Sequence, residues 1–476
     1  MLFNSLSFLL FLPVVLALYY ALPHKAQNRM LLVASIFFYA SWDWRFLAPL
    51  LFSTGIDFFC AQRMERLIRA GSPPESRQRY LWLSVVTNIG LLGFFKYFNF
   101  FSENLRHLLN TIGIEAAPTT LDVILPVGIS FYTFQALSYT IDVYRGELHA
   151  TASFWDFLLA VLYFPHLVAG PIQRASSLLP QVIEPRRTTR AQVDEGLHLI
   201  FWGFFKKVFI ADHLSPVVDA IFNKQTAPGG EVLLASFAFA VQIYCDFSGY
   251  TDIARGVAKL MGFEFVLNFN LPYLARNPQE FWSRWHISLS TWLRDYVYIS
   301  LGGNRKGERS LYRNLMLTML IGGFWHGAAW NFLLWGFYHG LLLVLHRVWV
   351  SPWEKRLTAK PEGVQRSIGA LQVLIMLPFT IYGWLLFRAT SLGQVVSFTG
   401  ALARLWEGWN SDLAWKIAFF TAPLAGVQLL QHASGRLHWL SFPWLPVEVR
   451  AGVYAALIYA VVFAGGQPQS FIYFQF

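Results

Sequence analysis

The sequence predicts an all-α polytopic membrane protein, and three observations support that prediction. Of the 476 residues, 55% are hydrophobic and 13% are charged, whereas about 25% are charged in soluble domains. Apolar runs of about 17–25 residues, long enough to cross a bilayer, recur along the whole chain. The alternating segments of about 10 residues that indicate a membrane β-barrel do not occur. We therefore expect about eleven membrane-embedded helical segments, in one domain that covers residues 1–476.

The N-terminal half begins with an apolar run that lacks the basic region and the small-residue cleavage pattern of a signal peptide. We interpret it as the first span, kinked at Pro13. The run Leu121–Tyr144 contains Pro126 and Gly128, so we expect a broken or re-entrant segment there. The apolar segments of this half are Leu6–Leu22, Met30–Ala40, Phe46–Cys60, Trp82–Phe101, Leu121–Tyr144 and Phe154–Gly170.

The C-terminal half carries charged residues inside its apolar runs. Lys206 and Lys207 interrupt one run, and Asp246 lies within the next. Intramembrane charges normally face an aqueous cavity or a partner. Leu315–Val350 is too long for one span, and we expect either two helices that turn near Gly327–Trp330 or one span followed by a buried partial helix. The apolar segments of this half are Leu197–Phe222, Val232–Met261, Leu315–Val350, Ile368–Phe387, Ile417–Leu430 and Val449–Ala464.

The net charge of +10 comes from Lys and Arg residues in loops between apolar runs. This pattern follows the positive-inside rule and gives no indication of nucleic-acid binding. We assign the basic stretches 62–80, 174–190, 305–313 and 355–366 to the cytoplasm. Counting crossings from these stretches places both termini outside. Cys60 and Cys245 have no metal-ligand spacing.

Two histidines, His286 and His326, each follow a tryptophan, in WHIS and WHGA. A titratable ring inside an apolar membrane run is costly, which makes it a functional candidate. A neutral imidazole suits a general base near pH 7. The alternative for either histidine alone is a hydrogen-bonded structural residue. Without further ligands at defined spacing, we expect no metal.

The loop LGGNRKGER between the histidines is a candidate binding site for a phosphorylated carrier or coenzyme, through Asn304, Arg305 and Lys306. The alternative is an ordinary cytoplasmic basic loop. It is not a Walker A loop, and no GxSxG nucleophile elbow occurs. The residues expected to face a cavity within the membrane or to contact substrate are Asp246, Arg284, Trp285, Trp325 and Asn331.

Six stretches of the chain closely resemble the membrane-bound O-acyltransferase (MBOAT) family, in particular its alginate O-acetylase branch. They stand in the family's order and cover nearly the whole chain: LPVGISFYTFQALSYTIDVYRG, FPHLVAGPIQR, DFSGYTDIARG, FWSRWHISLSTWLRDYVYISLGGNR, GGFWHGAAWNFLLWGFYHG and FIYFQF. The resemblance implies tilted helices around a central tunnel. It also implies that His326 is the family's WHG histidine and His286 its RWHISLS histidine.

The resemblance further implies a multi-pass O-acetyltransferase of a bacterial inner membrane. In this branch the enzyme takes an acetyl group from a cytoplasmic thioester, either acetyl-CoA or an acyl carrier, and needs no bound cofactor. His326 would deprotonate the attacking hydroxyl, and His286 or tryptophan N–H groups would stabilise the oxyanion. A C-terminal aromatic motif proposed as an acyl relay in related systems puts that role on Tyr473, in a periplasmic tail of residues 466–476.

The implied partners are a periplasmic SGNH-type acetyltransferase or another acetyl acceptor protein, and a polysaccharide acceptor. The stretch GPIQRASSLLPQ departs from the family pattern, so alginate, cellulose and peptidoglycan remain open as acceptors. The alternative functions are a transporter or flippase and a scaffold subunit of a polysaccharide export complex. The sequence disfavours a transporter because no inverted repeat or paired broken helices are evident.

Overall fold

The computed structural model describes residues 1–117, 120–121, 124–168, 170–357, 360–442 and 444–474, and within these ranges all regular structure is helical. The predicted all-α class is thereby confirmed. The contacts group into two compact units, residues 1–197 with 254–266 and residues 198–253 with 267–476. The single domain expected from the sequence remains a prediction.

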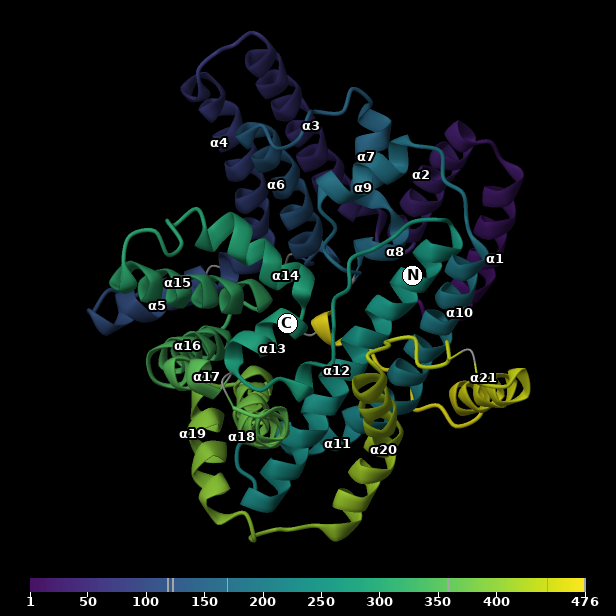
Figure 1. Cartoon of the computed structure of the whole chain (residues 1–476). Coiled ribbons are helices and arrows are strands. Elements are labelled where there is room, and N and C mark those ends of the chain that lie inside the picture. Colours follow the sequence, from purple (N-terminus) through teal and green to yellow (C-terminus); the bar gives the residue numbers. More distant parts are fainter. Residues whose placement is uncertain (118–119, 122–123, 169, 358–359, 443, 475–476) are drawn as a thin grey trace. The chain divides into compact units, whose positions relative to one another are not determined.

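The first unit begins with six helices of 14–23 residues and continues with three of 4–9 residues (Figure 1). Its helices are α1 (Leu6–Ala21), α2 (His24–Ala40), α3 (Leu47–Arg69), α4 (Pro74–Leu92), α5 (Phe98–Thr111), α6 (Ile129–Arg145), α7 (Phe154–Leu162), α8 (Phe164–Leu167) and α9 (Ala175–Ile183). Two of them correct the sequence-based boundaries. Helices α3 and α4 extend into the stretch 62–80 that was expected to be a loop, and leave only Ala70–Pro73 between them.

The expected break in Leu121–Tyr144 is present, because α6 begins only after Gly128, which adopts a left-handed conformation with φ 75°. A Cβ at Gly128 would lie 2.6 Å from the carbonyl oxygen of Leu167, so only glycine fits there. The expectation of one span over Phe154–Gly170 is wrong. The helix stops at Tyr163, just before Pro165, and α7 has only 9 residues, too few for the roughly 20 that a bilayer requires.

The second unit contains most of the long apolar helices and every candidate site residue, while residues 190–197 of α10 and 254–260 of α12 belong to the first unit. Helices α10 (Arg190–Phe204) and α11 (Asp212–Phe222) are joined by a π-helical segment over Phe205–Ala211. The others are α12 (Gly229–Leu260), α13 (Pro278–Arg284), α14 (Ile287–Trp292), α15 (Glu308–His326), α16 (Trp330–Leu345), α17 (Ser351–Leu357), α18 (Glu362–Arg388), α19 (Leu392–Ala401), α20 (Ser411–Ser434) and α21 (Val447–Val462).

Helices α15 and α16 form the hairpin expected from the length of the apolar run, with the turn between His326 and Trp330. Glycines bring the two backbones together. A Cβ at Gly323 would lie 2.3 Å from the carbonyl oxygen of Phe332, and one at Gly336 would lie 2.4 Å from that of Met319. Small residues permit such close helix packing within a membrane. The hairpin fixes His326 at the end of its first leg.

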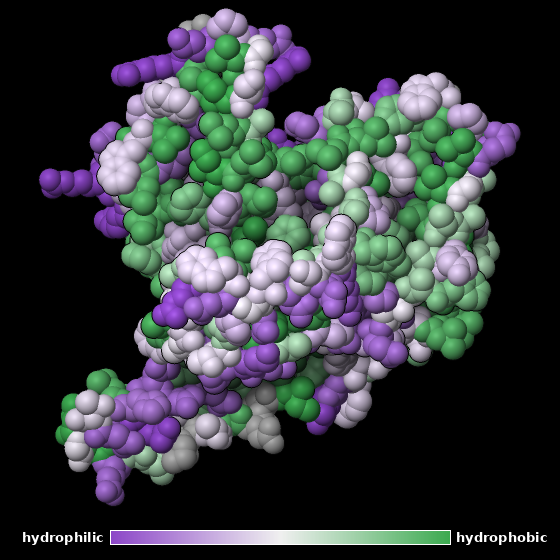
Figure 2. Space-filling view, turned by 90° about the horizontal axis from the view of Figure 1, so that it is seen from below, coloured by the Kyte–Doolittle hydropathy of each residue, from purple (hydrophilic) through white to green (hydrophobic). Residues whose placement is uncertain are grey.

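Five helical stretches among the described residues are long and apolar enough to cross a membrane: Pro74–Thr111, Gly229–Leu260, Trp330–Glu354, Glu362–Arg388 and Ser411–Ser434. Large apolar side chains on them are exposed, such as Leu374 and Phe419, and hydrophobic residues cover wide areas of the face in Figure 2. A lipid environment accounts for such exposure. The total of about eleven embedded segments remains a prediction.

Candidate active site

His286 lies in the short connection between α13 and α14, and its ring is fully buried. Its φ of 43° is left-handed, which is uncommon for a residue other than glycine and is typical of functional sites. Its Nδ1 accepts a hydrogen bond from the Leu289 N–H at 3.2 Å, which caps α14. An Nδ1 that accepts carries no proton, so the neutral ring bears its proton on Nε2. His286 can therefore act as a hydrogen-bond donor through Nε2.

His326 is the last residue of α15, buried among aromatic rings. The ring centroids of Trp325, Trp335 and Phe387 lie 4.9, 5.1 and 5.2 Å from that of His326. Trp325 also contacts His286, with centroids 6.1 Å apart. The two histidines thus share one aromatic neighbour, although different helices carry them.

Tyr473 from the C-terminal tail reaches both histidines. Its ring centroid lies 5.6 Å from that of His326 and 6.4 Å from that of His286. It also packs against Phe247 of α12, at 4.6 Å. The fold therefore brings together the three residues that the sequence singled out as catalytic or relay residues.

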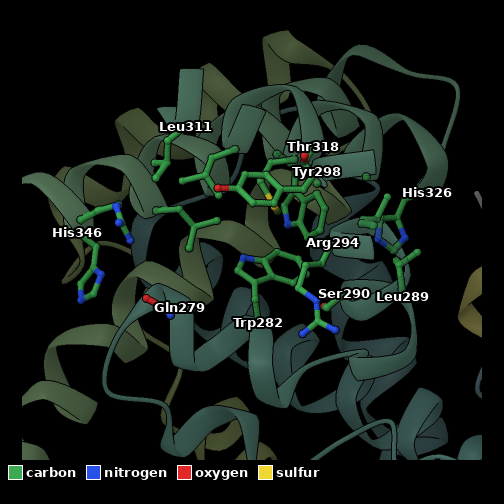
Figure 3. A pocket seen from close by; sticks show the side chains of 17 residues that line it. Gln279, Trp282, Leu289, Ser290, Arg294, Tyr298, Leu311, Thr318, His326 and His346 are labelled. Atoms are coloured by element: carbon green, nitrogen blue, oxygen red, sulfur yellow. The ribbon is translucent and has the colours of Figure 1, made fainter. Parts of the chain in front are cut away.

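A cavity of about 290 Å³ opens beside His326. In Figure 3, His326 stands at one end of the lining and His346 at the other. The middle of the cavity is mainly apolar, and Arg294 and Arg347 contribute guanidinium groups to the lining. The other lining residues are Gln279, Trp282, Leu289, Ser290, Leu293, Tyr298, Leu311, Leu315, Thr318, Met319, Gly322, Trp335 and Leu343. Such a space suits an extended, mainly apolar group with an anionic end.

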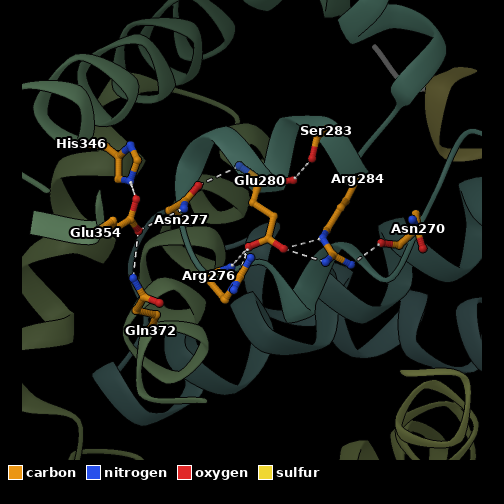
Figure 4. Close-up of polar contacts among 9 residues, drawn as sticks. All are labelled: Asn270, Arg276, Asn277, Glu280, Ser283, Arg284, His346, Glu354 and Gln372. Carbon is orange, nitrogen blue, oxygen red and sulfur yellow. Dashed lines mark hydrogen bonds and ion pairs between the residues drawn. The ribbon is translucent and has the colours of Figure 1, made fainter. Parts of the chain in front are cut away.

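Two of the residues predicted to line a tunnel, Arg284 and Trp285, do not line the cavity beside His326, and their tunnel role stays a prediction. Arg284 pairs with Glu280 at 2.6 Å and donates to the Asn270 carbonyl at 3.1 Å, within the polar network of Figure 4. Trp285 is buried against Phe281 and Trp384. Arg284 and Trp285 therefore hold the α13 region in place, and neither lines the cavity beside His326.

Asn331, at the start of α16, donates to the backbone carbonyls of Phe387 and Ala389, at 3.3 and 2.9 Å. This ties the α15–α16 turn to the end of α18, whose Phe387 contacts His326. The side chains of the predicted donor loop, Asn304, Arg305 and Lys306, are exposed. The backbone of that loop is held by Asn314, which donates to the Gly303 carbonyl at 2.9 Å.

Asp246 lies on α12, where its Oδ2 accepts from the backbone N–H of Ile472, the residue before Tyr473, at 2.8 Å. Its Oδ1 pairs with Lys207 at 2.9 Å. The sequence located the lysines and the carboxylate separately but did not predict their pairing. Lysines in one apolar run and aspartates in the next were the available signal, because buried charges of opposite sign need partners. Phe247, Arg294 and Arg347 were missed.

Comparison with known proteins agrees with this arrangement. The profile of the membrane-bound O-acyltransferase family matches residues 145–380. The chain is 38% identical to the probable alginate O-acetylase of Pseudomonas putida over the full length of both. The chain belongs to the membrane-bound O-acyltransferase family. It is therefore an acyltransferase and a multi-pass membrane protein.

Other relatives within this family have related names. The chain is 43% identical to the probable alginate O-acetylase of Azotobacter vinelandii, over 87% of this chain and 80% of the relative. It is 36% identical to the peptidoglycan O-acetyltransferase of Helicobacter pylori, over 82% of this chain and 78% of the relative. These two relatives are named for different polymers, and both are named for O-acetylation.

Proposed function

We propose that this acyltransferase passes an acetyl group from a cytoplasmic thioester, through an ester of Tyr473, to an acceptor outside the bacterial inner membrane. The observation that supports the proposal is the tyrosine ring beside both histidines, 5.6 Å from His326 and 6.4 Å from His286. The names of the relatives support an extracytoplasmic polysaccharide as the final acceptor, such as alginate or peptidoglycan.

The cavity beside His326 supports a route for the donor. Its mainly apolar lining suits the arm and acyl group of acetyl-CoA or of an acyl carrier, and Arg347 complements phosphate groups. Arg294 adds a second guanidinium, which pairs with Asp295 at 2.6 Å. We therefore propose that the cavity lining recognises the donor and that the exposed loop of Asn304, Arg305 and Lys306 makes the first electrostatic contact.

In the first step the hydroxyl oxygen of Tyr473 attacks the thioester carbonyl carbon, and His326 takes the hydroxyl proton. The oxyanion that forms accepts a hydrogen bond from Nε2–H of His286. Collapse of the intermediate breaks the carbon–sulfur bond, and the proton on His326 goes to the departing thiolate. The products are a free thiol and an acetyl ester of Tyr473.

In the second step a hydroxyl group from the periplasmic side attacks the tyrosyl ester. We propose that this hydroxyl belongs to an SGNH-type acetyltransferase or another acceptor protein, which then esterifies the polysaccharide. His326 takes the proton of the incoming hydroxyl and returns it to the phenolate of Tyr473. The enzyme is thereby regenerated.

The test is covalent labelling of the purified full-length protein with acetyl groups. Incubation with labelled acetyl-CoA, and separately with an acetylated carrier protein, should add one acetyl group, which peptide mass spectrometry should locate at Tyr473. Tyr473→Phe should remain unlabelled. A transporter or a scaffold would acquire no label, and an acetyl group on another residue would contradict the relay.

A further inference from the structure

A buried cluster of three charged residues meets the C-terminal tail just before Tyr473. The cluster consists of Lys207 from the π-helical segment, Asp212 from α11 and Asp246 from α12, all at most 2% exposed. Lys207 Nζ lies 2.9 Å from a carboxylate oxygen of Asp212 and 2.9 Å from one of Asp246. Burying one lysine with two aspartates leaves an excess of negative charge, which requires further donors.

The tail backbone completes the hydrogen bonding of this cluster. Lys207 donates to the carbonyl oxygen of Gln469 at 3.1 Å, so that with its two carboxylate partners all three ammonium protons have acceptors. The N–H of Ile472 donates to Asp246 at 2.8 Å. The cluster thus contacts the tail at two points, three residues apart, and together these contacts fix its register.

The approach of the tail depends on glycines. The N–H of Gly466 donates to the carbonyl oxygen of Val208 at 3.0 Å. A Cβ at Gly466 would lie 2.8 Å from the backbone of Asp212.

Glycines also bring α10 and α12 close together. A Cβ at Gly203 or at Gly249 would lie 2.7 Å from the carbonyl oxygen of the other glycine, so a side chain at either position would push the two helices apart. The π-helical segment then turns Lys207 toward Asp246.

We infer that Lys207 and Asp246 are positioning residues that hold the tail in the one register that sets Tyr473 between His286 and His326. A shift of one residue along the tail would break both backbone contacts and would move a neighbouring side chain into the position of Tyr473. The catalytic consequence of this anchoring rests on the proposed acyl relay through Tyr473. The anchoring itself is a physical claim that needs no acetyl transfer to be tested.

The neighbouring pair provides a matched control. Lys206, on the same π-helical segment, pairs with Asp252 of α12 at 2.6 Å and donates to Ser248 at 3.0 Å. Asp252→Asn therefore makes the same chemical change on the same helix as Asp246→Asn. A second test variant, Ile472→Pro, removes the N–H that donates to Asp246 and leaves every buried charge in place.

The experiment measures how fast a carboxypeptidase removes Phe474, and so exposes Tyr473 as the end of the chain, from the folded full-length protein in detergent, followed by intact mass. Asp246→Asn and Ile472→Pro should release Phe474 at least about tenfold faster than the parent, while Asp252→Asn should match the parent. If both test variants release Phe474 at the parental rate, the anchoring inference is wrong, whatever the chemistry. Should Asp246→Asn fail to fold, Ile472→Pro decides the question alone.

Acetyl transfer by the same variants separates the inference from the proposed function. Faster release together with lost acetylation supports both. Lys207→Arg, which keeps the positive charge beside Asp246, should preserve slow release. Faster release with full acetylation leaves the anchor standing and overturns the relay.

Discussion

The rings of His326 and Tyr473 lie with their centroids 5.6 Å apart and their planes inclined by 46°. His326 ends a helix deep in an apolar run, and Tyr473 comes from a tail that follows the last long helix. Neither the histidine nor the tyrosine alone suffices for group transfer. In the proposed mechanism they supply a base and a hydroxyl nucleophile at one place.

Replacing Tyr473 by Phe should lower polymer acetylation in cells by roughly 10²-fold or more, the scale of a lost catalytic group. The phenyl ring keeps the contacts with His326, Phe247 and Phe471, so the protein should accumulate to parental levels. The measurement is the acetate content of the polymer, normalised to protein in the membrane. Full acetylation by this variant would exclude the relay.

His326→Gln should reduce acetyl transfer by roughly 10²–10⁴-fold, because glutamine fills a similar volume but cannot take up a proton. His107→Gln is the control, since His107 is exposed in the other unit. Both variants should be expressed and assayed as purified proteins with labelled acetyl-CoA. Equal rates for the two would remove His326 from the mechanism.

His286→Asn separates the structural role of this residue from its chemical role. Asparagine tolerates the left-handed φ of 43° and can still cap α14 by accepting from Leu289. The variant should therefore keep the parental melting temperature. Loss of the Nε2–H donor should lower kcat by roughly 10²–10³-fold, as for other oxyanion donors. A variant that unfolds would indicate that His286 is structural only.

Thr318→Phe should fill the cavity beside His326, because Thr318 is buried and lines it. The preceding residue, Leu317, is 38% exposed, so Leu317→Phe adds bulk without entering the cavity. We expect Thr318→Phe to raise the KM for the thioester donor or to abolish turnover, and Leu317→Phe to behave as the parent. Steady-state kinetics with acetyl-CoA and with an acetylated carrier would measure this. Unchanged kinetics for Thr318→Phe would mean that the donor takes another path.

Gly336→Ala should destabilise the α15–α16 hairpin, because its Cβ would lie 2.4 Å from the carbonyl oxygen of Met319. The helices would have to separate, and we expect a loss of roughly 1–3 kcal/mol, as for overpacked cores. Gly426→Ala in α20 is the control, since no atom lies within 4 Å of its Cβ position. That change should be neutral or mildly stabilising. Thermal unfolding in detergent measures both variants.

Much of the fold followed from the sequence because its signals are local. The length of Leu315–Val350 and its glycines predicted the hairpin, and Pro126 with Gly128 predicted the break before α6. The errors were also local in origin. Hydropathy alone did not distinguish the polar C-terminal turns of α3 from a loop, because a helix can continue beyond the end of its apolar residues. It also did not detect the break at Tyr163, where the backbone and Pro165 end α7 within an apolar run.

The sequence by itself determined the class of protein and the family, together with the identities of His286, His326 and Tyr473. These follow from composition and motifs, which are properties of contiguous residues. Only the tertiary structure decided that the three rings meet, that Arg284 pairs with Glu280, and that Lys207 and Asp246 engage the tail. The physical reason is that the pairing of buried charges and the close packing of helices depend on residues that are distant in the chain. Hydropathy and residue spacing do not indicate which of these distant residues come into contact.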